Sequence, residues 1–263
     1  MSFDSERFNL PYMQQVALGY KAGIEYIVKF GENGNVQTGP EDVWDGGGLY
    51  TGQPLTDSET VDVSSDDAAD TAAGTGARSV EIQGLDENWE PQTETITLAG
   101  ATLVTSVGTF RRVYRVKVQT AGSGATNAGT ITCHHTTTTA NVFAAVQPTT
   151  GQSRNGVFTV PVGRVAIMPT FDLALARANG AAGSGQTNLL AREANGVYRA
   201  VLHNETTTTS HWSWDFKGGV VFPEKTDLKW QATDVSNTGT HCSVIFEIIL
   251  VAATELPTGL GVS

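Results

Sequence analysis

The sequence predicts an all-β protein made of antiparallel β-sandwich or jelly-roll-like regions with an extended N-terminal arm. Three observations support this fold class. Apolar and polar residues alternate through 77–133, as in strands that bury one face. A second series of strand-like segments fills 157–251. The 29 glycines and abundant threonines suit short strands joined by tight turns.

The length of 263 residues allows one large β domain or two smaller ones. We divide the chain into an N-terminal arm or docking segment (1–54), a first β region (55–145) and a second β-sandwich region (146–263).

The predicted arm mixes apolar side chains with scattered charges ahead of the glycines at 46–48. Pro11 favours a short helix over 12–20, and residues 23–30 fit a strand followed by a turn at 32–35. Two interpretations remain open: a segment packed on its own domain, or an arm that docks on a neighbouring subunit to cover its apolar residues. The candidate contact residues are Phe3, Phe8, Leu10, Tyr12, Met13, Trp44 and Tyr50.

The first β region is a predicted meander with strands near 79–83, 93–98, 109–118 and 129–133. Ahead of it, residues 56–70 carry six carboxylates. Calcium takes several oxygen ligands, but the spacing is not that of an EF-hand. We therefore favour a solvated acidic loop and leave weak calcium binding open.

A polar linker over 136–151 leads to the second β region. Its strands are expected at 157–161, 165–168, 171–176, 197–202, 211–216, 227–232 and 242–251, which suits a jelly-roll-like sandwich. The last segment is almost uniformly apolar. It is therefore expected to be central in its sheet and covered on both faces.

Charge and composition exclude several kinds of partner. The net charge of −11 argues against a main role in gripping nucleic acid, which needs clustered Lys and Arg. In the basic segment 111–117 we prefer an exposed strand face paired with acidic loops. No signal-peptide pattern and no apolar stretch near about 18 residues is present, so we expect no membrane partner. Cys133 and Cys242 are too few for a disulfide framework and are expected to be reduced.

Motifs that would carry chemistry are incomplete. Residues 180–187 resemble a phosphate-binding loop, but Gln186 stands where that loop needs Lys, so a hairpin tip is favoured. The histidines lack zinc-ligand spacing, and no Gly-x-Ser-x-Gly is present. Paired carboxylates that meet only in three dimensions stay untested by sequence. We expect no enzyme activity, no catalytic residues, no cofactor and no metal.

Trp212 and Trp214 lie two residues apart and therefore on one face of a strand. Stacking on a sugar is one interpretation. Packing in the sandwich core or in a subunit interface is the commoner use of tryptophan.

Several segments together resemble virion structural proteins of tailed bacteriophages. They are WDGGGLY at 44–50, AADTAAGTGAR at 68–78, VEIQGLD at 80–86, FTVPVG at 158–163 and PEKTD at 223–227. The resemblance implies membership of the virion and a β-rich fold, and it brings no catalytic residues.

The resemblance makes a head-associated role our first expectation, as a capsid decoration or minor capsid protein assembled in the host cytoplasm. Its partners would be other copies of itself, with a trimer as the first guess, and the major capsid protein or other virion proteins. The alternative is a tail or fibre module that recognises host glycan through Trp212 and Trp214.

Overall fold

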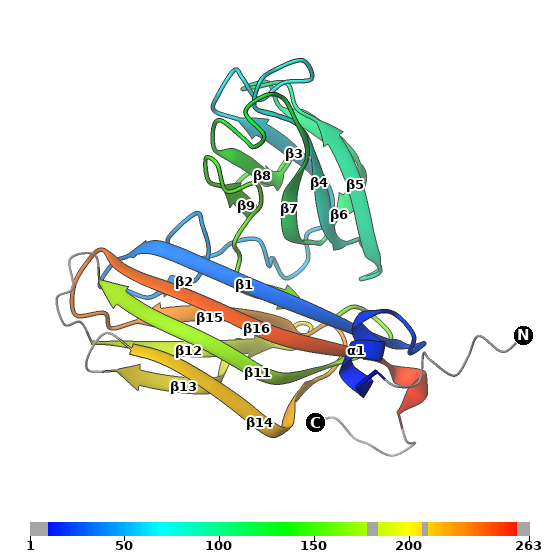
Figure 1. Ribbon diagram of the computed structural model, residues 1–263, viewed down its shortest axis with the longest axis vertical. Helices are drawn as coiled ribbons and strands as arrows, with labels where there is room; N and C mark the ends of the chain where they lie inside the picture. The colour runs from blue at the N-terminus through cyan, green and yellow to red at the C-terminus, as the bar shows by residue number, and fades with distance from the viewer. Residues whose placement is uncertain (1–9, 178–183, 207–209, 257–263) are drawn as a thin grey trace, which may run out of the picture.

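The computed structural model describes residues 10–177, 184–206 and 210–256. They form two β-sandwiches, one standing on the side of the other (Figure 1). We call the one that contains both ends of the described chain the main sandwich. The other, built from residues 59–146, is the insert sandwich.

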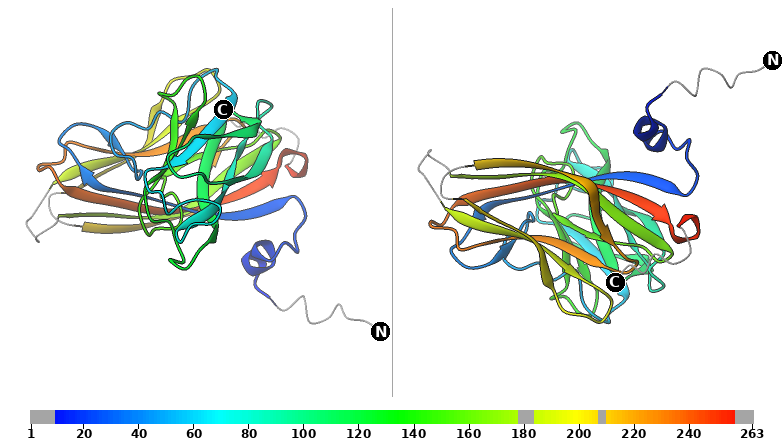
Figure 2. Two further views of the ribbon diagram at one scale, coloured as in Figure 1. Left: turned by 90° about the horizontal axis from the view of Figure 1, so that it is seen from above. Right: turned by 90° about the horizontal axis from the view of Figure 1, so that it is seen from below.

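The main sandwich has two layers, which Figure 2 shows edge-on. Sheet A has the order β1 (Ile24–Val36), β16 (Thr240–Ala252), β11 (Arg164–Arg177), β14 (Ser210–Phe222). Sheet B has the order β10 (Val157–Thr159), β15 (Asp227–Thr233), β12 (Gly185–Arg192), β13 (Arg199–Thr206), and β2 (Glu41–Asp42) also pairs with β15.

The strand pairs of the main sandwich are nested. The first strand pairs with the last, β1 with β16, and inside that pair lie β10 with β15, β11 with β14 and β12 with β13, all antiparallel. A long hairpin rolled up in this way is the arrangement of a jelly roll. The prediction of an all-β, antiparallel fold is confirmed.

The core of the main sandwich lies between sheets A and B. Alternate residues of each strand point inward, as the two-residue period of a strand requires. Trp230 of sheet B is fully buried, and its ring centroid lies 4.8 Å from that of Phe171 and 6.3 Å from that of Phe246, both in sheet A. The two sheets are thus held by large apolar side chains from both layers.

The insert sandwich has a core of its own, centred on residues such as Ile82, Phe110 and Phe143. One sheet has the order β6 (Val104–Phe110), β3 (Glu59–Ser65), β8 (Ile131–His135), β9 (Val142–Val146). The second sheet, sheet F, has the order β5 (Pro91–Thr97), β4 (Ala77–Leu85), β7 (Arg112–Ala121).

The chain enters the insert sandwich after β2 and returns just before β10. The two crossing points touch, because the Gly156 amide donates to the Val43 carbonyl at 2.8 Å. A buried ion network also crosses the junction: Arg112 of β7 and Arg192 of β12 both pair with Asp227 of β15, at 2.8 and 2.5 Å. Removing one partner from a buried network is costly, so these contacts fix the two sandwiches to each other.

Three of the predicted boundaries need correction. Residues 24–42 are part of the main sandwich, because β1 hydrogen-bonds to β16 and β2 to β15, so 1–54 is not one separate arm. The stretch predicted as a solvated acidic loop contains β3, a strand inside its sheet. The predicted polar linker contains β9, whose residues 143–146 are buried.

Little helix accompanies the strands. The described residues hold the short helix α1 (Tyr12–Ala17) and the 3-10 turn η2 (Ala253–Glu255). None of the helices in this part of the chain has the length and apolar character to cross a membrane. Cys133 and Cys242 are both free and buried, and burial raises the pKa of each thiol.

Candidate interaction surface

The outer side of sheet A carries an unusual number of apolar residues. Strand register places them side by side: Tyr26 lies opposite Ile249, which lies opposite Ile167, which lies opposite Val221. We call this surface the apolar face. Its members are Ile24, Tyr26, Val28 and Phe30 of β1, Ile245, Ile249 and Val251 of β16, Ile167 of β11, and Val221 of β14.

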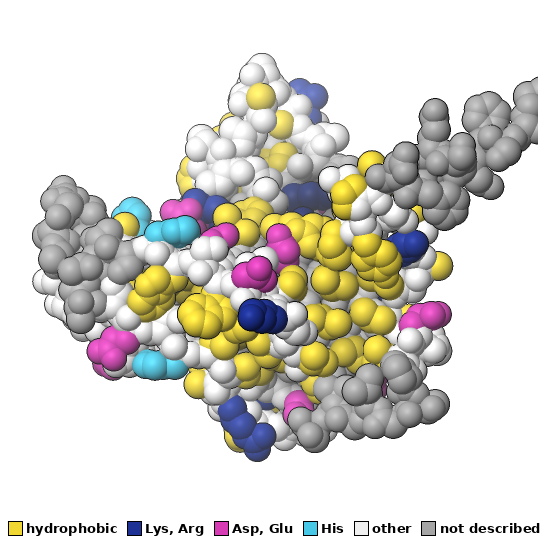
Figure 3. Space-filling view, turned by 60° about the horizontal axis from the view of Figure 1, so that its bottom comes forward, with side chains coloured by type: hydrophobic (Ala, Val, Ile, Leu, Met, Phe, Trp, Pro, Cys, Tyr) yellow, Lys and Arg dark blue, Asp and Glu magenta, His cyan; other side chains and the backbone are white. Residues whose placement is uncertain are grey.

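The apolar face is open in this structure. Hydrophobic side chains gather over β1, β16 and β11 in the space-filling view (Figure 3). Ile245 is 51% exposed, Val221 44% and Val28 41%. An exposed, contiguous apolar patch of this kind marks an interaction surface.

This openness corrects one prediction about β16. The strand is central, between β1 and β11, as its apolar run indicated. It is covered on one face only, because its inward residues such as Phe246 and Ile248 lie in the core while Ile245 faces outward. The almost uniformly apolar run of β16 was therefore a sequence signal of this apolar face.

A polar pair lies within the apolar face. Burial, and then a hydrogen bond with Glu247, raise the pKa of Tyr26 to about 12. The Tyr26 hydroxyl therefore stays protonated at any physiological pH beside the Glu247 carboxylate. A further charged residue, Asp172, lies opposite Ile245 on this side of sheet A.

Helix α1 stands off the outer side of sheet A, at the end where β1 begins (Figure 2). Of the predicted contact residues in this segment, Tyr12 is 54% exposed and Met13 39%, and Leu10 is half-buried. Phe3 and Phe8 lie outside the described residues. Tyr20, further along, is also half exposed.

Trp44 and Tyr50 are buried and do not lie on a free surface. Their rings meet edge to face at 5.2 Å, and the Tyr50 hydroxyl lies 3.2 Å from the carbonyls of Val113 and Phe143 in the insert sandwich. Gly46 is needed beside them, since a Cβ there would lie 2.2 Å from the Trp44 ring. These residues fix the chain where it enters the insert sandwich, and their buried side chains leave little surface for a partner.

Trp212 and Trp214 share one face of β14, as predicted. They lie opposite Leu173 and Phe171, which both belong to the core, so this is the inner face of sheet A. Trp212 packs against the core, whereas Trp214 is 57% exposed because β14 is the edge strand of its sheet.

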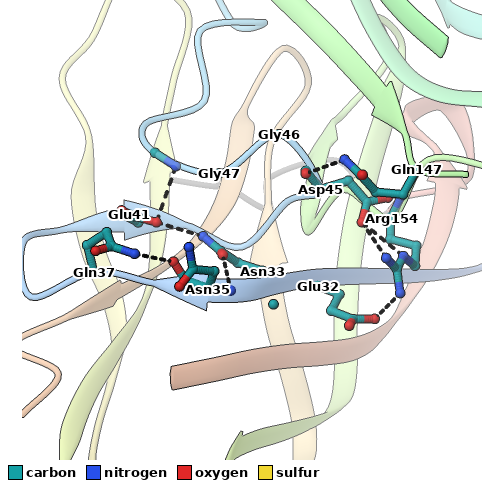
Figure 4. A pocket seen from close by; sticks show the side chains of 12 residues that line it. Glu32, Asn33, Asn35, Gln37, Glu41, Asp45, Gly46, Gly47, Gln147 and Arg154 are labelled. Atoms are coloured by element: carbon teal, nitrogen blue, oxygen red, sulfur yellow. Dashed lines mark hydrogen bonds and ion pairs between the residues drawn. The ribbon is translucent and has the colours of Figure 1, made fainter. Parts of the chain in front are cut away.

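A polar cavity of about 630 Å³ lies beside β1 and the glycine loop (Figure 4). Its charged groups are paired within its own wall. Arg154 pairs with Asp45 at 2.8 Å and also with Glu32, and Glu41 accepts hydrogen bonds from Asn33 and the Gly48 amide. Burial raises the pKa of Asp45 in spite of Arg154. The cavity therefore offers a ligand few unsatisfied groups.

The carboxylates of 56–70 serve the fold. Asp70 is buried and accepts hydrogen bonds from the Ser65 hydroxyl and from the amides of Ala77, Ala128 and Gly129. Burial opposes its ionisation, but these bonds lower its pKa overall. The hydroxyl and amide of Thr138 and the amide of Thr137 bind Glu59 and lower its pKa to about 2.

The histidines lie in separate places. His135 is buried in the insert sandwich, where its Nε2 lies 2.9 Å from the Phe110 carbonyl. His203 contacts Asn188 in sheet B, and His211 approaches Asp172 at 3.6 Å in sheet A. Within the described ranges, no group of three or more His, Cys, Asp or Glu is placed to hold a metal ion. Of the loop predicted at 180–187, residues 180–183 lie outside the described residues, and 185–187 belong to β12.

No family model and no curated protein matches the chain. A T=1 particle derived from infectious bursal virus is 12% identical, over 96% of this chain and 77% of that one, with a TM-score of 0.23. The structure of the Gt strain of infectious bursal disease virus is 14% identical, over 94% of this chain and 80% of that one, with a TM-score of 0.21. The VP2 subviral particle of that virus is 12% identical, over 94% of this chain and 78% of that one, with a TM-score of 0.23. At such TM-scores the likeness carries no argument about this chain.

Proposed function

We propose that this protein is a virion structural protein that assembles by self-association through the apolar face of sheet A. The observation that carries the proposal is the open, contiguous set of apolar side chains over β1, β16, β11 and β14. The segments that resemble tailed-phage virion proteins support the virion as its setting. In finer detail, the proposal is a head-associated role, as capsid decoration or minor capsid protein.

The occupant of the apolar face in this proposal is a second copy. Each chain carries an apolar segment that stands off the same side of sheet A, with Tyr12, Met13 and Leu18 exposed. Packing this segment on the next copy would bury both apolar surfaces at once. Such a contact joins two different surfaces, so it closes into a ring when the rotation permits, and a trimer is the first expectation.

The experiment is to measure oligomeric mass by light scattering for the wild type and for Ile245→Asp. The wild type is expected above its monomer mass of 27.8 kDa, and the variant at the monomer mass, because a carboxylate in the apolar contact is costly to desolvate. Thr95→Asp, on the exposed outer side of sheet F, is the matched control and should assemble normally. A wild type that stays monomeric at high concentration and within particles would contradict the proposal.

The role we propose is mechanical and involves no catalysis. Apolar burial contributes about 25 cal/mol per Å² before the costs of association, so a wide contact is sufficient to hold neighbouring subunits.

A second candidate function, glycan recognition by a tail or fibre module, is favoured by one observation. Trp214 exposes 57% of its surface at the edge of sheet A, where a sugar ring has room to stack. Binding to host-cell glycans that is lost in Trp214→Ala, with assembly unchanged, would support this function over the first. The core-packed neighbour Trp212 makes a poor test, because its truncation would also damage the fold.

A further inference from the structure

A groove of about 360 Å³ runs between the main and insert sandwiches, next to the apolar face. β1 forms one wall, with Tyr26 and Val28 belonging to both the groove and the apolar face. Strands β4, β5 and β7 of sheet F form the other wall. The two positive side chains of the groove, Lys29 and Arg115, come one from each wall.

The Lys29 amine is buried and has a backbone partner. Lys29 is 3% exposed, and its Nζ donates to the Tyr114 carbonyl at 2.5 Å. Burial, followed by the charge of Arg115, holds the pKa of Lys29 well below its usual value. A buried ammonium is normally paired with a carboxylate, and an anion bound in the groove would favour the charged form of Lys29, which burial disfavours.

Arg115 adds a second set of donors. One of its nitrogens donates to the Val28 carbonyl at 3.2 Å, and a guanidinium has five N–H groups in all. Among the described residues, neither Arg115 nor Lys29 forms an ion pair, and no carboxylate lines the groove. Lys117, on the same strand, is by contrast paired with Glu81 at 2.8 Å.

We propose that this groove is an anion site that receives a carboxylate side chain from a second copy of the chain. Lys29 and Arg115, from opposite walls, would each supply N–H donors to one carboxylate, whose binding would favour the charged form of Lys29. The chain has carboxylate side chains in excess, with 27 acidic against 16 basic residues. The groove also continues into the apolar face, so one neighbouring copy would cover both. The identity of the ligand rests on the proposed self-association, whereas the anion site itself does not.

The anion site is tested by titrating a tetraglutamate peptide into Ile245→Asp protein at low salt, with calorimetry as the readout. Binding is expected, and it should weaken about tenfold or more in Lys29→Met and in Arg115→Gln, since hydrogen bonds to charged groups are strong. Methionine suits the buried position because it is unbranched and apolar. Lys117→Gln removes the same charge outside the groove and should bind as before. Equal binding in all four proteins overturns the site.

Two further arms identify the source of the anion. Acetate or inorganic phosphate that binds as tightly as the peptide would overturn the choice of a protein carboxylate. In the otherwise wild-type chain, Arg115→Gln should raise the dissociation constant of the oligomer about tenfold and reduce its dependence on salt. An unchanged oligomer, together with loss of peptide binding, would remove the second copy as ligand. If Ile245→Asp still dissociates the oligomer, that result would leave the proposed self-association through the apolar face unaffected.

Discussion

Sheet A of the main sandwich and sheet F of the insert sandwich are both antiparallel, and both turn alternate apolar residues toward a core. They differ on the side away from the core. The outer side of sheet F carries the polar ladder Ser79, Glu81, Gln83, Thr93, Thr95, Thr97, Arg115 and Lys117. The outer side of sheet A carries the apolar face.

The difference separates what a sheet needs in order to fold from what it needs in order to bind a partner. One apolar side is enough to fold a sheet, as sheet F demonstrates with its polar outer side. A second apolar side adds nothing to the isolated chain and lowers its solubility, and its presence on sheet A is the reason for the proposed self-association. Strand β16 carries both kinds of residue in alternation: Phe246 packs in the core, and its neighbour Ile245 lies on the apolar face.

The strongest way to break the comparison is to truncate two neighbouring residues of β16. Phe246→Ala should lower the free energy of unfolding by about 4 kcal/mol, because Phe246 is fully buried against Trp230. Ile245→Ala should cost less than about 1 kcal/mol in the monomer, since its side chain is half exposed. Urea unfolding of both variants measures this. Equal losses would mean that the outer side of sheet A is covered within the chain.

The next largest effect is expected where the two sandwiches meet. Asp227→Asn should lower the free energy of unfolding by about 3 kcal/mol, because Arg112 and Arg192 would stay buried without their carboxylate. Calorimetry should then resolve two thermal transitions, as each sandwich has its own core. A variant that melts in one transition at the wild-type temperature would contradict the role of this network.

An apolar residue placed on sheet F sharpens the comparison from the other side. Thr95→Ile should change the free energy of unfolding by no more than about 0.5 kcal/mol, because position 95 is exposed on a polar surface. It should not change the oligomeric mass, since a single exposed apolar side chain does not make a contiguous apolar patch. Light scattering and urea unfolding check the two parts, and a new oligomer would show that a single apolar residue is sufficient.

The smallest effect concerns pH and the insert sandwich. The pKa of Glu59 is about 2 in the folded chain against 4.5 in a free side chain. Its stabilising effect is therefore present above pH 4.5 and is lost as the pH falls toward 2. Exposure to solvent keeps it under about 1 kcal/mol. The difference in unfolding free energy between wild type and Glu59→Gln should narrow from pH 6 to pH 2.5. A difference that widens would contradict a lowered pKa of Glu59 in the folded chain.

The sequence predicted those strands whose alternation is local. The segments at 79–83 and 93–98 correspond to β4 and β5, and 242–251 to β16. The boundary at 54 was wrong because β1 finds its partner at the far end of the chain, where no local pattern reveals it. The strand predicted at 109–118 is two strands that break at Arg111, since β6 and β7 belong to different sheets.

The candidate surfaces were foreseen only in part. Tyr12, Met13 and Trp214 are exposed, and their contact roles stay predictions, whereas Trp44 and Tyr50 are buried within the chain. The groove with Lys29 and Arg115 had no signal in the sequence. Those two residues are brought together by the stacking of the sandwiches, which neither segment encodes alone.

The nested pairing of the main sandwich also sets the order in which the chain is able to fold. During synthesis β1 is made early, yet Ile24 pairs with Val251, which is made more than a whole domain later. The insert sandwich draws its strands from 59–146 and has a complete core before that point. It is expected to fold first, while the apolar strand β1 waits unpaired. Such long-range closure makes folding slow and leaves an interval in which chains aggregate at high concentration.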